Sequence, residues 1–225
     1  MLLRPKMSKN SYPVKRKVDK DKALTELKKK MKEDETLPLR RSATNLVFGD
    51  GDPDSEILFV GEGPGYWEDQ KGIPFVGNAG ALLNQTLSLI EIPREKVYIT
   101  NVIHYRPPEN RDPLPSEIKA FEPYLDEIIK IIDPKLIVTL GRFSMAKFLP
   151  GVFISSVHGK PKQVNWSGRE ITVVPMYHPA AALRSTDVKF KLKNDFLRIP
   201  EILTSIKNQK KDDKMDKKVE QMNLI

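Results

Sequence analysis

The segment ILFVGEGPG, residues 57–65, joins a continuous apolar run to a turn that contains three glycines. Such a run, bounded by a Gly-rich turn, is typical of a strand that is buried on both faces of a parallel sheet. Three similar runs follow along the chain: VYITNVI (97–103), LIVTLG (136–141) and ITVVPMY (171–177). The segment 57–65 therefore predicts the first strand of an α/β domain, with its turn at the carboxyl edge of the sheet, where open parallel sheets bind ligands.

Helical patterns separate these runs, so the sequence predicts a three-layer α/β/α fold with a central four-stranded parallel sheet. The chain has 225 residues, which favours a single domain with tails, and we place this domain at 21–206. The expected helices are 21–32, which is basic and amphipathic, 79–90, 116–132 with Ser116 as the N-cap, 142–149, and about 193–207 with an interruption at Pro200.

The net charge of +8 belongs to the two ends of the chain, because residues 36–206 hold twenty basic and twenty acidic side chains. We expect residues 1–20 to be a disordered basic arm and residues 207–225 a disordered Lys-rich tail, which either attract phosphates loosely or only keep the chain in solution. No stretch approaches the ~20 apolar residues of a membrane span, and the N-terminus lacks the apolar core of a secretory signal. We therefore expect no membrane contact and an intracellular location.

The chain contains no cysteine, which excludes disulfides, a cysteine nucleophile and any cluster held by four thiolates. His104 and His158 have no third partner of the metal-ligand type, so we do not expect them to bind a metal.

Glycine and polar residues follow the predicted strands at one edge of the sheet. Taken singly, each has an ordinary structural explanation: a Gly-rich turn, a turn-forming Asn or a structural His. The glycine spacing fits neither a P-loop nor a dinucleotide fingerprint. The combination is more informative, because Glu62, Phe75, Asn101 and His178 are all predicted at the same edge of one parallel sheet.

Longer motifs contain these residues: GEGPG-x-x-ED, G-x-PFVG-x-AG-x-LLN, VYITNV, RPPENRDPLP, IVTLG and HPAAALR. They resemble the motifs of family 4 uracil-DNA glycosylases, in the family's order and approximate spacing, over about residues 37–205. The resemblance implies hydrolysis of the bond between uracil and deoxyribose in DNA, as the first step of base excision repair. The nucleotide must first be flipped into a pocket, because this bond is inaccessible inside stacked DNA. The motifs hold no plausible Schiff-base lysine, so we expect no strand cleavage.

The resemblance also assigns roles in binding the base. Phe75 would stack on the extruded base, and Asn101 would pair with both N3–H and O4 of uracil, a pattern that cytosine reverses. His178 would stabilise the negative charge on uracil O2, and the backbone N–H groups around Gly63 and Gly65 would add to this effect.

Activation of the attacking water is assigned less directly. Several relatives carry a polar residue at the position of Gly63, which has no side chain here. Glu62 and Glu68 are therefore the acidic candidates, with Asn110 as a water-positioning partner. The resemblance places Leu183 and Arg184 on a DNA-intercalating loop, where the first fills the gap left by the base and the second holds a phosphate.

The sequence departs from the family at the ligands of its iron–sulfur cluster. By the flanking motifs, the four cysteine positions correspond to Asp34, Leu37, Tyr105 and Phe121, so we expect no cofactor and no metal. In the family, the cluster links the N-terminal segment to the loop after the second strand. We expect Leu37, Tyr105 and Phe121 to replace this link by apolar contact, with Asp34 at the rim, free to pair with a nearby cation and contributing little. The alternative is that these positions are unrelated surface and the N-terminal segment is loose.

Two alternatives remain open. One is a non-catalytic DNA-binding subunit of a replication or repair complex, against which the retention of Glu62, Phe75, Asn101 and His178 argues. The other is a glycosylase that also removes hypoxanthine or xanthine, which the residues do not separate from the uracil enzyme. The expected partner is DNA that contains uracil, and His104 and His158 are expected to be structural or to face this DNA. The expected compartment is the cytoplasm or nucleoid of a prokaryote, or the DNA-containing compartment of a host cell. We further expect a monomer, with a repair or replication protein as a partner of the basic tails.

Overall fold

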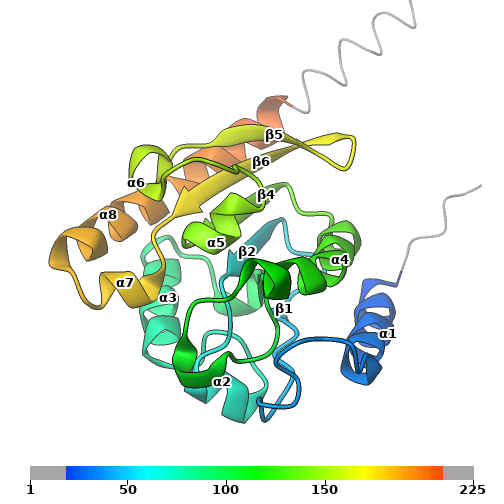
Figure 1. Cartoon of the computed structure of the whole chain (residues 1–225). Helices are drawn as coiled ribbons and strands as arrows, with labels where there is room; N and C mark the ends of the chain where they lie inside the picture. The colour runs from blue at the N-terminus through cyan, green and yellow to red at the C-terminus, as the bar shows by residue number, and fades with distance from the viewer. Residues whose placement is uncertain (1–18, 210–225) are drawn as a thin grey trace, which may run out of the picture.

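The computed structural model describes residues 19–209, in which helices cover both faces of one sheet (Figure 1). The predicted arm at 1–20 and tail at 207–225 lie almost entirely outside these residues. Both predictions are wrong at the boundary with the domain. Lys20 begins the helix α1 (Lys20–Glu33), and residues 207–209 still belong to a helix.

Six strands form the sheet of the described residues, in the order β1-β3-β2-β4-β6-β5. The four apolar runs become β2 (Ile57–Gly61), β3 (Tyr98–Asn101), β4 (Leu136–Leu140) and β6 (Arg169–Met176), which are parallel to one another. The predicted four-stranded sheet is therefore incomplete. An antiparallel strand lies at each edge, β1 (Asp50–Gly51) beside β3 and β5 (Lys162–Trp166) beside β6.

Neither edge strand carries an apolar run, which explains why the sequence did not predict them. β1 has two exposed residues, and β5 alternates half-buried and exposed side chains. A weaker signal does mark the hairpin of β5 and β6, because Trp166 pairs with Arg169 and leaves Ser167 and Gly168 as a two-residue turn. Both turn residues have positive φ, as tight hairpin turns require.

Alternate residues of the strands point to two separate cores, one on each face of the sheet. Leu58 and Val60 of β2 pack with α1 and α4 (Pro115–Ile132), whereas Ile57 and Phe59 pack with α3 (Asn78–Leu89) and α8 (Thr186–Leu197). In Figure 1, α1 and α4 accordingly lie on one side of the sheet and α3, α7 (Pro179–Ala182) and α8 on the other. The three-layer α/β/α prediction is confirmed.

Several helix ends differ from the predicted ones. Leu114, not Ser116, is the N-cap of α4, because the Glu117 side chain binds the Leu114 N–H and Pro115 suits the first helical position. Helix α5 (Arg142–Ala146) is shorter than predicted. Helix α8 starts earlier, at Thr186, where Ser185 caps it. The break before the last helix, 199–209, falls at Arg198, two residues ahead of Pro200.

The positions that correspond to cluster cysteines lie in or beside the α1/α4 core. Leu37, Tyr105 and Phe121 are buried members of one apolar cluster, and the Tyr105 and Phe121 ring centroids are 6.1 Å apart. Asp34 does lie at the rim, but hydroxyl groups bind it in place of the expected cation. Its Oδ2 accepts a hydrogen bond of 2.6 Å from Tyr124, and its Oδ1 accepts one from Thr36. Apolar packing thus joins the N-terminal segment to the domain.

Candidate active site

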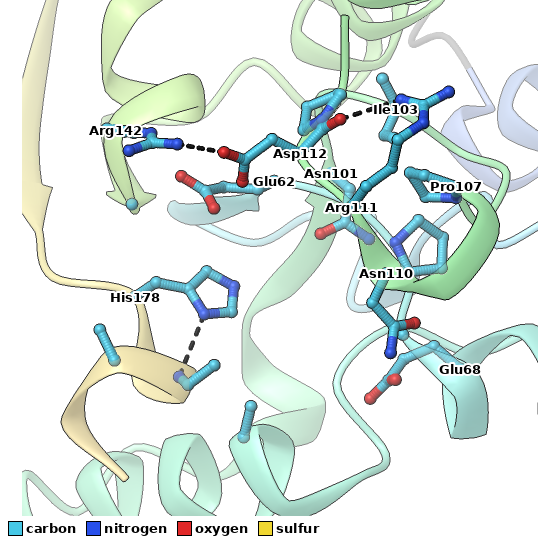
Figure 2. A pocket seen from close by; sticks show the side chains of 18 of the residues that line it. Glu62, Glu68, Asn101, Ile103, Pro107, Asn110, Arg111, Asp112, Arg142 and His178 are labelled. Atoms are coloured by element: carbon cyan, nitrogen blue, oxygen red, sulfur yellow. Dashed lines mark hydrogen bonds and ion pairs between the residues drawn. The ribbon is translucent and has the colours of Figure 1, made fainter. Parts of the chain in front are cut away.

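A cavity of about 600 Å³ opens at the carboxyl ends of the parallel strands (Figure 2). The register of the sheet aligns these ends, because Gly61 of β2 pairs with Asn101 of β3 and Leu140 of β4 pairs with Met176 of β6. The loops that leave the strands therefore converge on one space. Nine residues predicted from the sequence line it: Glu62, Gly63, Gly65, Glu68, Phe75, Asn101, Asn110, His178 and Arg184.

Gly61, the last residue of β2, and Gly63, two residues later, leave room for neighbouring side chains. A Cβ on Gly63 would lie 2.7 Å from the Ile103 side chain, so a larger residue would require Ile103 to move. A Cβ on Gly61 would lie 2.3 Å from Asn101 Oδ1 and 2.6 Å from the Phe75 ring. Gly61 was not among the predicted site residues, yet its lack of a side chain allows Asn101 and Phe75 to approach each other.

Phe75 lies on the cavity wall in a left-handed backbone conformation, with φ +52°. A phenylalanine rarely adopts this conformation without support from its neighbours. Its ring stacks on the His178 ring, with centroids 5.6 Å apart and an angle of 29° between the planes. The stack fixes the position of Phe75 relative to His178.

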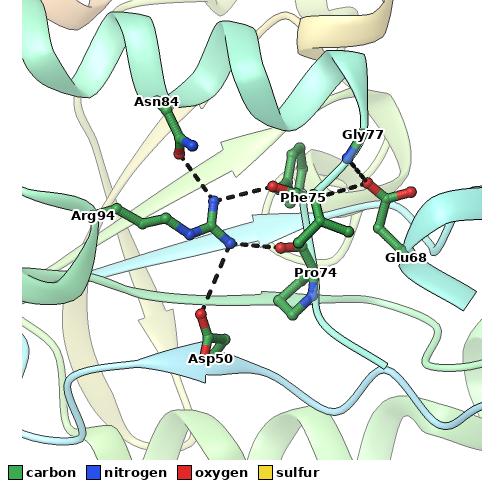
Figure 3. Close-up of polar contacts among 8 residues, drawn as sticks. Asp50, Glu68, Pro74, Phe75, Gly77, Asn84 and Arg94 are labelled. Carbon is green, nitrogen blue, oxygen red and sulfur yellow. Dashed lines mark hydrogen bonds and ion pairs between the residues drawn. The ribbon is translucent and has the colours of Figure 1, made fainter. Parts of the chain in front are cut away.

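Two side chains clamp the loop 74–77 from opposite sides (Figure 3). Arg94 donates to the carbonyl oxygens of Pro74 (2.5 Å) and Phe75 (3.2 Å), and it also donates to Asn84 Oδ1 (3.1 Å). Glu68 Oε1 accepts from the N–H groups of Val76 (2.9 Å) and Gly77 (2.8 Å). Arg94 was not predicted from the sequence, because an Arg after a helix has no local signal for a contact made 19 residues earlier in the chain.

Asn101 ends β3 with its side chain buried against the cavity. Its Oδ1 has no hydrogen-bond partner among the described residues. A buried acceptor without a partner costs about 1–3 kcal/mol, which a ligand donor can recover. The neighbouring Thr100 bonds the Phe48 carbonyl at 2.7 Å and so holds the end of the strand in place.

His178 is the N-cap of α7, and the surrounding protein lowers its pKa to about 4, chiefly through desolvation. The ring is therefore neutral near pH 7. Its Nδ1 accepts a hydrogen bond of 3.1 Å from the Ala180 N–H, so the single ring proton resides on Nε2. Figure 2 shows this second nitrogen on the side of the ring away from the dashed hydrogen bond, facing the interior of the pocket.

The two acidic candidates differ in their surroundings. Burial raises the pKa of Glu62, although its Oε1 accepts a hydrogen bond of 3.0 Å from the Phe143 N–H at the start of α5. Arg142 and Asp112, which form an ion pair on the cavity wall, influence this pKa in opposite directions. Glu68 is already engaged by the loop 74–77, which favours a positioning role for it.

Asn110 faces the cavity from a short 3-10 helix (Pro108–Asn110) in which Glu109 and Asn110 both have positive φ. Its Oδ1 accepts a hydrogen bond of 2.8 Å from Arg106 Nε, so its amide nitrogen is the group that it can offer to a ligand. Arg111 and Glu117 hold the rest of this loop by a two-point ion pair of 2.9 and 2.6 Å.

Leu183 does not line the cavity, and it is exposed directly beyond the last residue of α7. Arg184, the next residue, lies on the wall. His104 is fully buried and bonds Thr100, so it is structural and does not face DNA. His158 bonds Asp195 at 2.8 Å and packs on the Tyr177 ring.

Two features are absent from residues 19–209. No helix in this range is long and apolar enough to cross a membrane. The same range contains no group of three or more His, Cys, Asp or Glu side chains arranged to hold a metal ion.

The fold and the cavity match a known family. The chain belongs to the uracil DNA glycosylase superfamily, whose sequence profile matches residues 48–199 and thus every strand of the sheet. More particularly, it is similar to type-4 uracil-DNA glycosylases. That of Sulfurisphaera tokodaii is 47% identical over 165 residues, which cover 71% of this chain and 75% of that protein. That of Archaeoglobus fulgidus is 45% identical over 170 residues, covering 73% and 85%.

Proposed function

We propose that this protein is a uracil-DNA glycosylase, which hydrolyses the bond between uracil N1 and C1′ of deoxyribose after the nucleotide has been flipped out of the DNA. The observation that carries the proposal is the arrangement around Phe75. The aromatic face, the unpaired acceptor of Asn101 and the Nε2–H donor of His178 meet in one cavity. A flat base with one N–H donor and carbonyl acceptors on its edge complements these three groups.

Recognition of uracil follows from the polarity of the Asn101 amide. Oδ1 accepts from uracil N3–H, and the amide nitrogen donates to O4, while Phe75 stacks on the ring. Cytosine has an acceptor at N3 and a donor at its amino group, so both contacts would be lost and buried polar groups would remain unpaired. This mismatch excludes cytosine by its hydrogen-bonding pattern.

Departure of the base requires charge stabilisation. As the C1′–N1 bond breaks, its electron pair moves onto uracil, and negative charge gathers on O2. A neutral imidazole with its proton fixed on Nε2 donates to this oxygen without giving up the proton. The donor is already oriented by Ala180, so it does not have to reorganise during the reaction.

Water completes the reaction by attacking C1′ and passing a proton to a base. Of the two acidic candidates we assign this role to Glu62, because burial raises its pKa, which makes its carboxylate a better proton acceptor. Glu68 holds the Phe75 loop, and Asn110 faces the same space as a donor. Leu183 acts as the wedge that fills the gap left by the flipped nucleotide, and Arg184 contacts a phosphate of the same strand.

The test is an excision assay on oligonucleotides that hold a single uracil, hypoxanthine or normal base. We expect uracil to be released and the strand to break only after alkali treatment. His178→Ala should lower the rate by about two to three powers of ten, as for the loss of one oxyanion donor, with little change in DNA affinity. Strand breaks that appear before alkali treatment would refute the prediction that the protein leaves the strand intact. Release of hypoxanthine would show that the protein removes other deaminated bases as well. If no base is released although the oligonucleotide binds, the chain is a DNA-binding subunit and the proposed activity is wrong.

A further inference from the structure

Two large aromatic side chains stand exposed at the edge of the cavity. Tyr66 and Trp67 occupy the first turn of α2 (Tyr66–Lys71) and are 48% and 56% exposed. They lie between Gly65 and Glu68, which both line the cavity. Their rings pack edge to face, with centroids 5.1 Å apart, so they form a joint aromatic surface.

The fold of α2 does not depend on these rings. Its buried anchor is Asp69, whose carboxylate accepts the backbone N–H groups of Thr44 (2.8 Å) and Asn45 (3.1 Å). Asp69 therefore fixes the inner side of the helix, and the two aromatic residues remain on the outside. Exposed tyrosine and tryptophan at the edge of a ligand cavity commonly mark a contact surface.

The surroundings of the aromatic pair indicate what it contacts. The Arg106 guanidinium lies 5.2 Å from the centre of the Tyr66 ring, and its Nε bonds Asn110 at the cavity wall. Trp67 lies close to Gly77, where the Phe75 loop enters α3. The surface thus combines stacking faces with a positive charge, and it is continuous with the wall that holds Phe75. Bases and phosphates of a nucleic-acid strand match this combination.

Arg184 also lines the cavity, and the exposed Leu183 precedes it at the end of α7. Figure 2 shows Glu68 of α2 and Asn110 on one side of the pocket and His178 with α7 on the other. If a flipped nucleotide enters between these sides, the neighbouring nucleotides on one side of it pass α7, and those on the other side pass α2. Leu183 is exposed beside α7, and Tyr66 and Trp67 are exposed on α2.

We propose that Tyr66 and Trp67 form a stacking platform for unpaired bases next to the extruded nucleotide, with Arg106 binding the adjoining phosphate. The proposal rests on the proposed function for the position of the flipped base. Because aromatic stacking requires a free base face, the platform favours single-stranded DNA around the uracil over intact duplex. It also tolerates any sequence at this position.

Intrinsic fluorescence tests the contact directly, because the chain contains two tryptophans, Trp67 and Trp166. Trp166 lies in β5, beside Arg169, and serves as the reference. In a Trp166→Phe protein, we expect uracil-free oligothymidine to quench the emission of Trp67. In a Trp67→Phe protein, the same oligonucleotide should leave the emission of Trp166 unchanged. Binding through the basic ends of the chain would not produce this difference.

Kinetics provide the second readout. Trp67→Ala and Tyr66→Ala should each raise KM for a single-stranded uracil oligonucleotide about tenfold, with kcat unchanged, which is within the range for loss of one stacked base. Trp67→Phe should restore most of the loss, since it keeps an aromatic face. Phe190→Ala removes another exposed aromatic side chain, on α8, and should match the unmodified protein.

The outcomes separate the two proposals. If oligothymidine binds, as measured by anisotropy, while the emission of Trp67 stays constant and Trp67→Ala keeps the normal KM, the platform is refuted and the surface serves another partner. If quenching occurs but the unmodified protein releases no uracil, the platform stands and the proposed activity fails.

Discussion

Among single residues, His178 and Glu62 divide the chemistry because the protein shifts their pKa values in opposite directions. Desolvation lowers the pKa of His178 to about 4, and burial raises that of Glu62 above the usual range for a carboxyl group. The first shift favours the neutral imidazole donor, and the second makes the Glu62 carboxylate a stronger proton acceptor. Both shifts act in the direction that the proposed reaction needs.

The raised pKa of Glu62 predicts the acidic limb of the pH profile. Glu62 must be deprotonated to act as the base, so the single-turnover rate should fall as pH falls through its raised pKa, while His178 is still neutral. Glu62→Gln should be slow and should lack this limb. Glu68→Gln, the matched control, should keep the limb even if its overall rate is lower. An unchanged limb in Glu62→Gln would assign the base to another residue.

Specificity depends on the amide of Asn101. In Asn101→Asp the new carboxylate can accept from the amino group of cytosine, and it no longer donates to uracil O4. We expect slower release of uracil and a measurable release of cytosine from oligonucleotides that hold one target base. Strict rejection of cytosine by this variant would mean that another group discriminates between the bases.

The loop between α2 and α3 shows how whole elements position a single ring. Arg94, which precedes β3, and Glu68, from α2, bind backbone groups of residues 74–77. These bonds hold Phe75 in its left-handed conformation. Gly80 of α3 completes the support, because a Cβ there would lie 1.9 Å from the Phe75 carbonyl oxygen. Three separate segments thus determine where the stacking ring lies.

Removing one side of this clamp should affect the chemistry more than the fold. Arg94→Ala should lower kcat/KM for uracil excision roughly tenfold to a hundredfold, because small displacements of a stacking group are costly. Arg94→Lys should recover only part of this loss, since one ammonium cannot reproduce the fork of donors. Arg169→Ala, which removes a surface arginine paired with Asp133, is the control and should keep normal kinetics. Equal losses in both arginine variants would indicate a general effect on stability.

The contact between α1, α4 and the loop after β3 is a matter of packing. Phe121 is completely buried and Tyr105 nearly so, both in the apolar cluster with Leu37. Phe121→Ser should lower the free energy of unfolding in urea by about 3–5 kcal/mol, and Tyr105→Ser by less. Phe190→Ser, at an exposed position, should change it by no more than about 0.5 kcal/mol. A Phe121→Ser protein of normal stability would refute the packing explanation.

For the molecule as a whole, the absence of cysteine predicts independence from iron. The purified protein should be colourless, contain no stoichiometric iron, and unfold at the same temperature with and without a metal chelator. Elemental analysis and thermal unfolding check these points together. Iron at one atom or more per chain, with visible charge-transfer absorbance, would overturn the prediction.

The sequence predicted the parts of the molecule that carry strong local patterns. Continuous apolar runs predicted all four parallel strands, and their order placed Phe75, Asn101 and His178 together. The edge strands β1 and β5 were missed because neither has an apolar run. The grip of Glu68 and Arg94 on the Phe75 loop was missed for another reason: these bonds join side chains to backbone groups of a loop, and no residue pattern records them.

The residues of the pocket come from early and late parts of the chain, so the order of synthesis decides when the pocket is complete. Glu62, Phe75 and Asn101 belong to β2, β3 and their loops, whereas His178 follows β6, the last strand of the sheet. A ribosome releases these parts in sequence, and domains fold as their segments emerge. A chain arrested before residue 178 would hold the groups that recognise the base and lack the donor that stabilises its departure. Incomplete translation products would therefore be inactive on DNA even where their first strands had paired.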